Sequence, residues 1–388
     1  MISAQSKIGI AGAGAMGTGI AQVAAMAGHE VYVYDSQPAS LEKAKNNLLQ
    51  SLNRLTEKQK LTKELAEKIF NHTNFIANLS DFSGCDLVIE AIVENLEVKQ
   101  KLFSELEKAV NEKCVLATNT SSLSIASIAS ACKNPSRFLG IHFFNPATLM
   151  PLVEIIPGIA TEKNLTAEIK KLIDNWGKIT VITKDTPGFI VNRVARPFYS
   201  ESLRIYEEGI ADLATIDWAM KEFGGFKMGP FELMDLIGHD VNYVVTETVW
   251  KQFYFDPKFK PALSQKRLLE AGFLGKKTGK GFYDYSKPLP EPNKNTELGK
   301  IICNRVLCML MNEAADALYY QIASKEDIDL AMTKGVNYPK GLLKWADEIG
   351  IDKVLNTIQD LYNLFQEDRY RPSVLLKKTA GSGEKFYS

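Results

Sequence analysis

The stretch from Lys7 to Asp35 constrains the fold of this chain more than any other. A short apolar run from Ile8 to Ala11 is typical of a strand buried on both faces, and the glycine-rich turn GAGAMG follows it directly. An apolar helix is expected from Ala15 to Ala27, followed by a second strand from Glu30 to Tyr34 that ends at Asp35. The stretch therefore predicts a strand, turn, helix and strand unit, with the helix N-terminus at the turn.

The glycine-rich turn has the residues that a bound pyrophosphate requires. Gly12 permits the tight turn, Gly14 leaves the backbone open to a phosphate group, and Gly17 lets the helix pack close to the strand. The unpaired amides of the first helical turn and the helix dipole attract anions, so Ala15 and Met16 join the glycines as expected cofactor contacts.

Asp35 indicates which dinucleotide the turn binds. A carboxylate at the end of the second strand can accept both ribose hydroxyls of an adenosine, and it would repel a 2′-phosphate. We therefore expect NAD in preference to NADP. The alternative is an ordinary strand-helix-strand unit with an empty turn, which would not need the acid.

The composition excludes several classes of partner. Lys and Arg total 46, as do Asp and Glu, so no global field attracts nucleic acid or an anionic membrane. No apolar run reaches the roughly 20 residues of a membrane span, and the N-terminal segment lacks the order of a secretory signal, so a cytoplasmic location is expected. The five cysteines form no CxxC pair and the four histidines have no metal-binding spacing, which predicts free thiols and no metal.

Strands and helices alternate along the first half of the chain. Residues 38–71 are expected to form a helical hairpin inserted after the second strand, and further strand and helix patterns continue to about Lys184. This alternation predicts a Rossmann-type doubly wound sheet domain over residues 1–185. The sequence Asp-Thr-Pro-Gly at 185–188 breaks the pattern, and long helices follow it.

The helical half contains an internal repeat with an offset of 112 positions, which relates Asn192 to Asn304. The same offset relates Arg193 to Arg305, Glu201 to Glu313, and Gly229 to Gly341. We therefore expect two homologous all-α domains, at residues 186–286 and 297–388, joined by the proline-rich segment 286–296. The predicted fold class is α/β, a sheet domain followed by these two helical domains.

Hydride transfer from an alcohol to NAD requires a base that removes the hydroxyl proton. His142 stands at the end of a predicted strand, on the side of the sheet where ligands bind. Glu154 is a lone carboxylate within the apolar run LVEII of the next predicted strand, where its charge is costly unless a donor compensates it. A His142 and Glu154 pair meets both requirements, whereas an isolated histidine in a strand would more often be structural.

A polar cluster, Asn119 to Ser124, follows another predicted strand where a helix cap is due. Capping needs one or two such residues, so the excess indicates side chains turned toward a ligand.

Taken together, these motifs resemble the 3-hydroxyacyl-CoA dehydrogenase family. The resemblance rests on the glycine turn and on AIVENLEVK, TNTSSL, HFFNPA, LVEII, DTPGFIVNR, GPFELMD and GKKTGKGFYDY, which occur in this order and extend to Tyr285. It implies an enzyme of fatty acid metabolism and β-oxidation that oxidises an L-3-hydroxyacyl-CoA with NAD to the 3-ketoacyl-CoA, in either direction.

The resemblance also implies roles for individual residues. His142 is then the base and Glu154 its orienting partner. Ser121, Asn145 and Asn192 then hold the substrate's hydroxyl, its thioester carbonyl or the histidine. Asp35 binds ribose, and Glu94, Lys99 and Lys277 lie on the NAD side. The hairpin is a CoA-contacting arm, with Ser51 and Lys58 at the matching positions.

Three functions remain open from the sequence. The leading one is oxidation of a short-chain substrate such as 3-hydroxybutyryl-CoA, with Phe144, Met150 and Phe226 as candidates to line the acyl pocket. The others are a relative that oxidises a sugar acid without CoA, and a non-catalytic NAD-binding protein. The second helical domain lacks the GPFE and GKKTG elements, so we expect it to replace a partner subunit in a monomer, or to change how a homo-oligomer is built.

Overall fold

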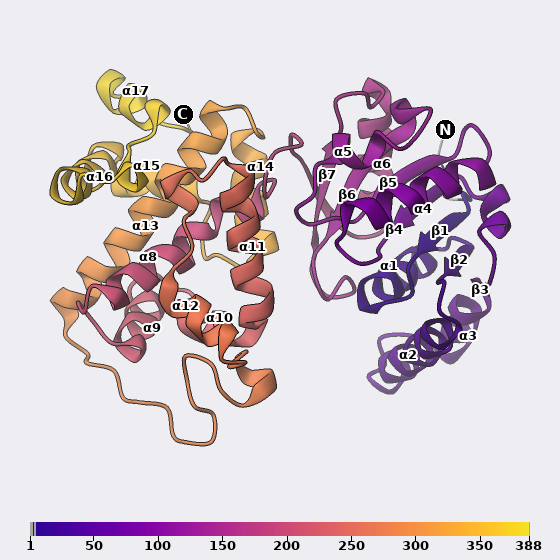
Figure 1. Ribbon diagram of the computed structural model, residues 1–388, viewed down its shortest axis with the longest axis horizontal. Helices are drawn as coiled ribbons and strands as arrows, with labels where there is room; N and C mark the ends of the chain where they lie inside the picture. The colour runs from indigo at the N-terminus through magenta and orange to yellow at the C-terminus, as the bar shows by residue number, and fades with distance from the viewer. Residues whose placement is uncertain (1–2, 4, 388) are drawn as a thin grey trace. The chain divides into compact units, whose positions relative to one another are not determined.

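The chain forms two compact units. A computed structural model describes residue 3 and residues 5–387, and it divides the chain between Thr186 and Pro187 (Figure 1). The first unit contains a sheet with helices, and the second contains helices joined by loops.

The first unit is built on an eight-stranded sheet formed by its described residues. Its strands, in chain order, are β1 Ile8–Ala11, β2 Val31–Tyr34, β3 Thr73–Ile76, β4 Leu87–Glu90, β5 Val115–Thr118, β6 Phe138–Phe143, β7 Leu152–Pro157 and β8 Ile179–Ile182. The spatial order is β3-β2-β1-β4-β5-β6-β7-β8. Strands β1 to β6 are parallel, β7 is antiparallel to β6, and β8 is parallel to β7. The parallel part confirms a Rossmann-type α/β fold, with the switch in strand order between β1 and β4.

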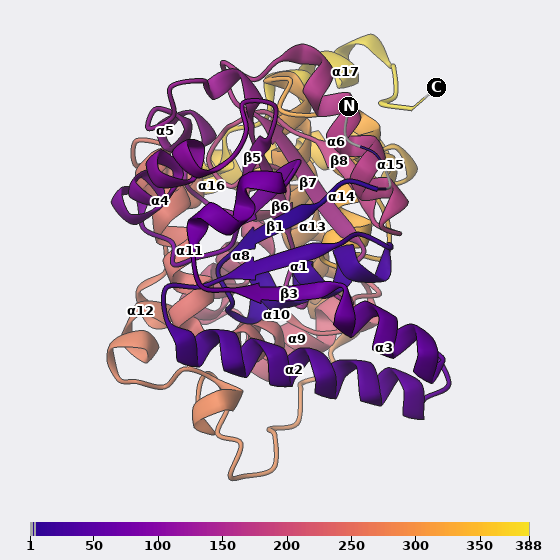
Figure 2. The same cartoon turned by 90° about the vertical axis from the view of Figure 1, so that its right-hand side faces the viewer.

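The first helix and the hairpin of this unit follow the predicted ranges closely, and three further helices lie between the later strands. They are α1 Ala15–Met26, α2 Pro38–Glu57, α3 Lys63–Asn71, α4 Leu96–Ala109, α5 Ile125–Ala129 and α6 Lys163–Asn175. Helices α2 and α3 form the expected hairpin, which lies beside the edge strand β3 (Figure 2). One hydrophobic core joins one face of the sheet to α1, α2, α3 and α6.

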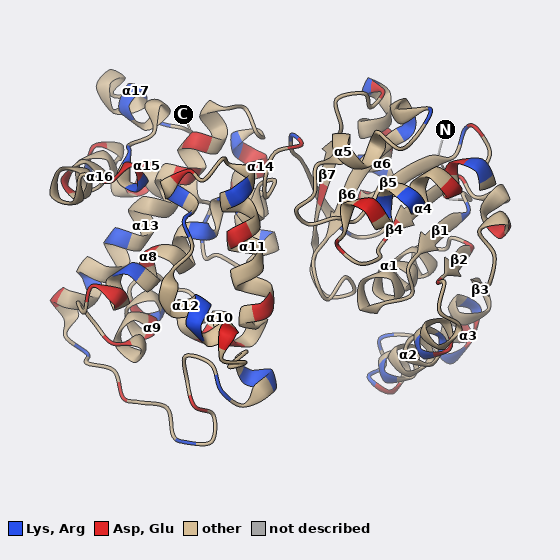
Figure 3. Cartoon of the chain, viewed as in Figure 1, with Lys and Arg blue, Asp and Glu red and all other residues tan. Residues whose placement is uncertain are grey.

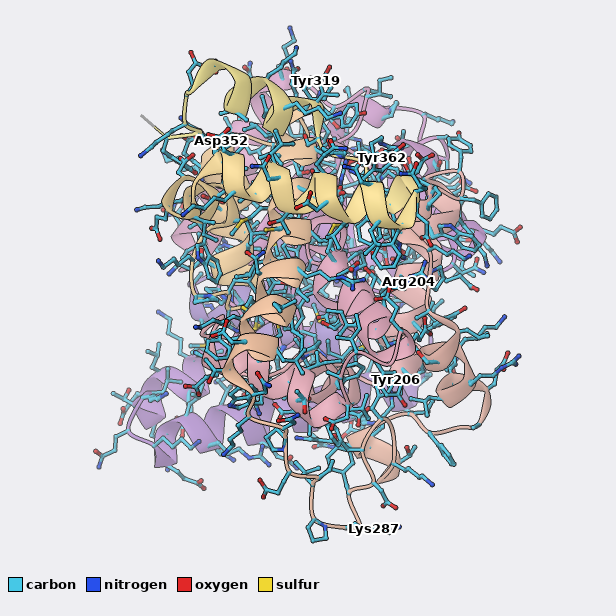
Figure 4. The ribbon with its side chains drawn as sticks, turned by 90° about the vertical axis from the view of Figure 1, so that its left-hand side faces the viewer. Arg204, Tyr206, Lys287, Tyr319, Asp352 and Tyr362 are labelled. Atoms are coloured by element: carbon cyan, nitrogen blue, oxygen red, sulfur yellow. The ribbon has the colours of Figure 1, made fainter. Side chains whose placement is uncertain are left out.

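The second unit consists of helices separated by short loops and 3₁₀ turns. Its earlier helices are α7 Val191–Val194, α8 Arg196–Glu207, α9 Leu213–Glu222, α10 Pro230–Ile237, α11 His239–Gln252 and α12 Leu263–Glu270. Its later helices are α13 Thr296–Tyr319, α14 Lys325–Gly335, α15 Leu342–Ile349, α16 Ile351–Phe365 and α17 Val374–Ser382. Helix α16 packs across α13, with Asp352 near one end and Tyr362 near the other (Figure 4).

Two buried ion pairs link the earlier and later helices reciprocally. Arg193 donates from Nε to Glu313 at 2.6 Å, and Arg305 donates from Nε to Glu201 at 2.6 Å. Arg193 and Arg305 are related by the offset of 112 positions, and so are Glu201 and Glu313. Each arginine thus binds the glutamate of the other half, as equivalent residues of two identical subunits do across an isologous two-fold interface.

Matching hydrogen bonds also occur at the ends of α10 and α15. Asp217 accepts from the amide of Phe231 in the first turn of α10, at 2.9 Å. Asp329 accepts from the amide of Leu343 in the first turn of α15, at 2.8 Å. The halves differ at their first helix, because Ala195 separates α7 from α8 whereas α13 is continuous.

The mixed distribution of charged residues and the free state of the cysteines agree with the sequence analysis. Lys and Arg are interspersed with Asp and Glu over both units (Figure 3). All five cysteines are free and buried. Among the described residues, no helix is both long and apolar enough to cross a membrane.

Candidate active site

Two glycines of the turn before α1 have no room for a side chain, whereas the third faces open space. Gly12 has a φ of 117°, and a Cβ there would lie 2.5 Å from the carbonyl oxygen of Ala91. A Cβ on Gly17 would lie 1.8 Å from the carbonyl oxygen of Gly12. At Gly14, by contrast, nothing lies within 4 Å of the added atom. The backbone therefore presents bare amides where a pyrophosphate would bind, so this site fits a dinucleotide.

Asp35 supports this turn at the carboxyl end of β2. Its Oδ2 accepts from the amide of Ala13 at 2.8 Å, and its Oδ1 accepts from the amide of Gln37 at 2.9 Å. Each carboxylate oxygen can accept a further hydrogen bond, so the side chain retains the capacity to bind ribose hydroxyls.

His142 and Glu154 face each other across the only antiparallel pair of strands in the described sheet. They are direct partners in the β6 and β7 register, and Nδ1 of His142 lies 2.7 Å from Oε2 of Glu154. His142 is 5% exposed and Glu154 is fully buried. The strand reversal after β6 brings these residues, twelve positions apart, onto one sheet face, and so the pairing expected from the sequence is present.

A second buried carboxylate on the sheet was not selected by the sequence reasoning. Glu90, at the end of β4, accepts from the ammonium of Lys99 at 2.5 Å, from the hydroxyl of Thr118 at 2.6 Å, and from the amide of Ile92 at 2.7 Å. Glu90 is fully buried and Lys99 is 1% exposed. The signal that identified Glu154, a lone acid in an apolar run, was also present in the LVIEA sequence around Glu90.

Glu94 organises the loop that contains Ser121. Its Oε1 accepts from the hydroxyl of Thr120 at 2.6 Å and from the amide of Ser121 at 2.9 Å, while Oε2 lies 3.2 Å from the ammonium of Lys99. Burial raises the pKa of Glu94, but the Lys99 charge and the bonds from Thr120 and Ser121 outweigh it, so the pKa is below its usual value. Glu94 is therefore a carboxylate at neutral pH.

Other members of the polar cluster also have protein partners. Asn119 accepts from the amide of Phe143 at 2.8 Å. Ser124 caps α5 by accepting from the amide of Ser127 at 3.2 Å, and it donates to Asp185 at 3.0 Å. Much of the excess over helix capping is thus explained by hydrogen bonds that fix the loop.

The remaining predicted site residues lie on other helices and loops. Asn145 is exposed just after β6. Ser51 is partly buried on α2, and Lys58 is exposed at the C-terminal cap of the same helix. In the second unit, Asn192 lies on α7, and Lys277 forms an ion pair with Asp240 at 2.5 Å.

The open turn, the acid at the end of β2 and the switch in strand order together define an NAD-binding oxidoreductase domain. Comparison with known proteins identifies its family. The model described as "3-hydroxyacyl-CoA dehydrogenase, NAD binding domain" matches residues 7–186, and "3-hydroxyacyl-CoA dehydrogenase, C-terminal domain" matches residues 188–285 and 301–385. The chain belongs to the 3-hydroxyacyl-CoA dehydrogenase family, and it is an NAD-dependent dehydrogenase.

Individual relatives agree with this assignment. The chain is 36% identical to a 3-hydroxyadipyl-CoA dehydrogenase from Escherichia coli, over 98% of each protein. It is 40% identical to a 3-hydroxybutyryl-CoA dehydrogenase from Bradyrhizobium diazoefficiens, over 75% of this chain and 99% of that protein. A crystal structure of an E. coli 3-hydroxybutyryl-CoA dehydrogenase superimposes with a TM-score of 0.94 at 35% identity, covering 98% of this chain and 100% of that one.

Proposed function

We propose that the enzyme oxidises a short-chain L-3-hydroxyacyl-CoA, such as 3-hydroxybutyryl-CoA, and catalyses the reverse reduction, with His142 as the general base. The observation that carries this proposal is the buried contact of 2.7 Å between His142 and Glu154. A carboxylate in that position orients the imidazole and stabilises the imidazolium that forms when the ring takes a proton.

The proton path follows from the orientation of the ring. With Nδ1 donating to Glu154, Nε2 is the atom that takes the proton from the substrate's 3-hydroxyl group. NAD, when bound, accepts the hydride from the same carbon. Ser121, Asn145 and Asn192 hold the substrate's hydroxyl and thioester carbonyl or the histidine, as the family resemblance implies.

The cofactor contacts have two parts in this proposal. Gly12, Gly14, Ala15, Met16 and Gly17 surround the pyrophosphate, and Asp35 binds the ribose of the adenosine. Glu94, Lys99 and Lys277 belong to the nicotinamide side. Because Lys99 is buried between two carboxylates, it acts there by holding Glu94 in place.

The CoA moiety is assigned to the hairpin. Ser51 and Lys58 are seven positions apart on α2, about two helical turns, so one extended group can reach both. A lysine at the exposed end of the helix suits a phosphate group.

We also propose that the chain has three domains, at residues 1–185, 186–286 and 297–388. The second and third of these are the homologous helical domains. The reciprocal Arg193 to Glu313 and Arg305 to Glu201 pairs support this division, because they relate the two halves as an isologous interface relates two subunits. The second helical domain thus takes the place of a partner subunit, and the protein is a monomer. The five free thiols favour a cytoplasmic location.

The acyl group remains to be defined more finely. The names of the E. coli relatives differ on this point, because an adipyl group ends in a carboxylate and a butyryl group ends in a methyl group.

The test is consumption of NADH with acetoacetyl-CoA, run beside the same assay with free acetoacetate. We expect rapid reduction of the thioester alone. His142→Ala should bind NADH as the wild type does while turnover falls by roughly 100- to 10,000-fold, the usual loss for a general base. Turnover of His142→Ala at the wild-type rate would refute the assignment of the base. Reduction of neither substrate, with NADH still bound, would favour a non-CoA hydroxy acid or a non-catalytic role.

A further inference from the structure

Lys178 holds together the loop that connects the two strands of the dyad. This connecting loop consists of residues 144–151, between β6 and β7. The ammonium of Lys178 donates to two of its carbonyl oxygens, that of Ala147 at 2.5 Å and that of Met150 at 2.9 Å. One side chain therefore ties two points of the connecting loop to the residue that precedes β8.

The topology of the sheet places Lys178 at the edge where ligands bind. Strand β7 is antiparallel to β6 and β8 is parallel to β7, so β8 begins where the parallel strands β1 to β6 end. Leu152 and Ile179 are register partners at this edge, and the amide of Ile179 donates to the carbonyl of Pro151 at 2.8 Å. The carboxyl edge of the parallel strands is where open α/β sheets bind their ligands. Lys178 thus lies on the same edge of the sheet as the end of β6.

The charge of Lys178 is satisfied by the connecting loop and not by an acid. The side chain is half-buried, and burial lowers the pKa of its ammonium. Among the described residues no carboxylate offsets this effect. Holding a lysine side chain in one conformation also costs rotamer entropy, which water bound to the two carbonyl oxygens would not require. What the lysine adds over water is a fixed position for the loop.

The connecting loop also lies against the helix that follows the glycine turn. Ala147 is 2% exposed, and a Cβ added to Gly19 of α1 would lie 3.2 Å from the Cβ of Ala147. Within the loop, the amide of Met150 donates to the carbonyl of Pro146 at 2.9 Å. Lys178 therefore fixes a segment that touches α1 and continues into both strands of the dyad.

We infer that Lys178 is a positioning residue for the dehydrogenation, which acts by holding the connecting loop. His142 lies two residues before this loop and Glu154 three residues after it, so a shift of the loop moves the ends of both strands. Asn145 lies within the loop itself. Reacting groups need support that holds them to within about 0.5 Å of the productive geometry. The inference rests on the proposed function, because that proposal assigns His142 as the base and Asn145 as a substrate contact.

The test compares two replacements of the lysine. Lys178→Met keeps much of the side chain but removes its donors, whereas Lys178→Arg keeps donors that can reach both carbonyl oxygens. We would measure kcat for 3-hydroxybutyryl-CoA per NADH-binding site, with the sites counted by fluorescence titration, so that unfolded enzyme does not enter the result. Lys178→Met should lower kcat by about 10- to 100-fold, since a misplacement of about 1 Å can cost on the order of 100-fold in rate. Lys178→Arg should recover most of this loss.

The Kd of NADH should stay at the wild-type value in both variants, because the glycine turn keeps its own contacts. Lys178→Gln has a neutral amide that can donate to a carbonyl oxygen, so its kcat should fall between those of the Met and Arg variants. This variant provides the same comparison with Lys178→Arg if Lys178→Met does not fold.

Lys170→Met is the matched control in the same unit. Lys170 lies on α6 and donates to Asp174 at 3.0 Å and to Thr180 of β8 at 2.8 Å. Its replacement also removes an ammonium group that makes two hydrogen bonds, but these bonds do not involve the connecting loop. The kcat per NADH-binding site of Lys170→Met should equal that of the wild type.

Three results would overturn the inference. A kcat of Lys178→Met within a few fold of Lys170→Met would show that the connecting loop does not need the lysine. A loss that Lys178→Arg fails to recover would assign the effect to packing of the side chain and not to its hydrogen bonds. A parallel rise in the Kd of NADH would assign Lys178 to cofactor binding. A wild type that binds NADH but does not oxidise 3-hydroxybutyryl-CoA would instead refute the proposed function itself.

Discussion

Replacement of Glu154 by Gln isolates the charge of the buried dyad from its geometry. Gln has the shape of Glu, and its side-chain oxygen can still accept the hydrogen bond from Nδ1 of His142. The hydrogen bond of 2.7 Å and the ring orientation are therefore kept, while the negative charge beside the developing imidazolium is lost. Glu154 is fully buried and His142 is 5% exposed, so water does not take over this stabilisation.

The size of the effect follows from Coulomb's law. Opposite charges centred about 4 Å apart attract each other by about 4 kcal/mol at the effective dielectric constant of roughly 20 that suits protein sites. Since each 1.36 kcal/mol of barrier corresponds to a tenfold change in rate, Glu154→Gln should lower kcat for oxidation by about 1,000-fold.

The assay is NADH formation from a 3-hydroxyacyl-CoA under saturating NAD, together with fluorescence titration of NADH. We expect kcat to fall while the Kd of NADH stays at the wild-type value, because Glu154 does not lie at the glycine turn. Glu107→Gln is the control, since it removes a largely buried carboxylate that binds Arg137 elsewhere in the same unit. A kcat for Glu154→Gln within a few fold of the control would show that the buried charge does not stabilise the transition state.

Two other predictions concern stability and assembly. Lys99→Met leaves Glu90 buried without its cation. Because one side of a buried ion pair is lost, the free energy of unfolding measured by urea denaturation should fall by about 3 to 5 kcal/mol. A loss below about 1 kcal/mol would mean that the hydrogen bonds from Thr118 and Ile92 are enough to stabilise the carboxylate. Light scattering should give the mass of a single chain, because Arg305 and Glu201 already form the interface contacts within it; a dimer joined through the first helical domain would contradict this.

Much of the first unit could be predicted because its signals are local. The apolar runs on either side of the glycine turn and its helix predicted strands β1 and β2 to within a residue, and the turn chemistry predicted the cofactor site beside them. The pairing of His142 with Glu154 was also accessible, because the cost of burying a carboxylate in LVEII requires a donor.

The unpredicted features depend on contacts between distant segments. Lys99 has the sequence context of an exposed helical lysine, and only the folded structure shows that it is buried against Glu90. The direction of β7 is not encoded by hydrophobic periodicity. The signal that could have given it is the short connection at residues 144–151, because a parallel neighbour needs a longer crossover. Arg196 likewise stands between Ala195 and Pro197 at a helix start, a setting usual for solvent-exposed arginine, but the fold buries it against Thr246 and Tyr199.

The reciprocal arginine and glutamate pairs have a consequence for how the protein behaves on dilution. A dimer of identical subunits dissociates when its concentration falls below the dissociation constant, and every substitution in it appears twice. Here both halves of the interface are carried by one polypeptide, so the effective concentration of one for the other is fixed by the linker at residues 286–296. Activity per chain should then be constant down to nanomolar enzyme, and the two halves can carry different residues at equivalent positions, such as Phe226 and Tyr338.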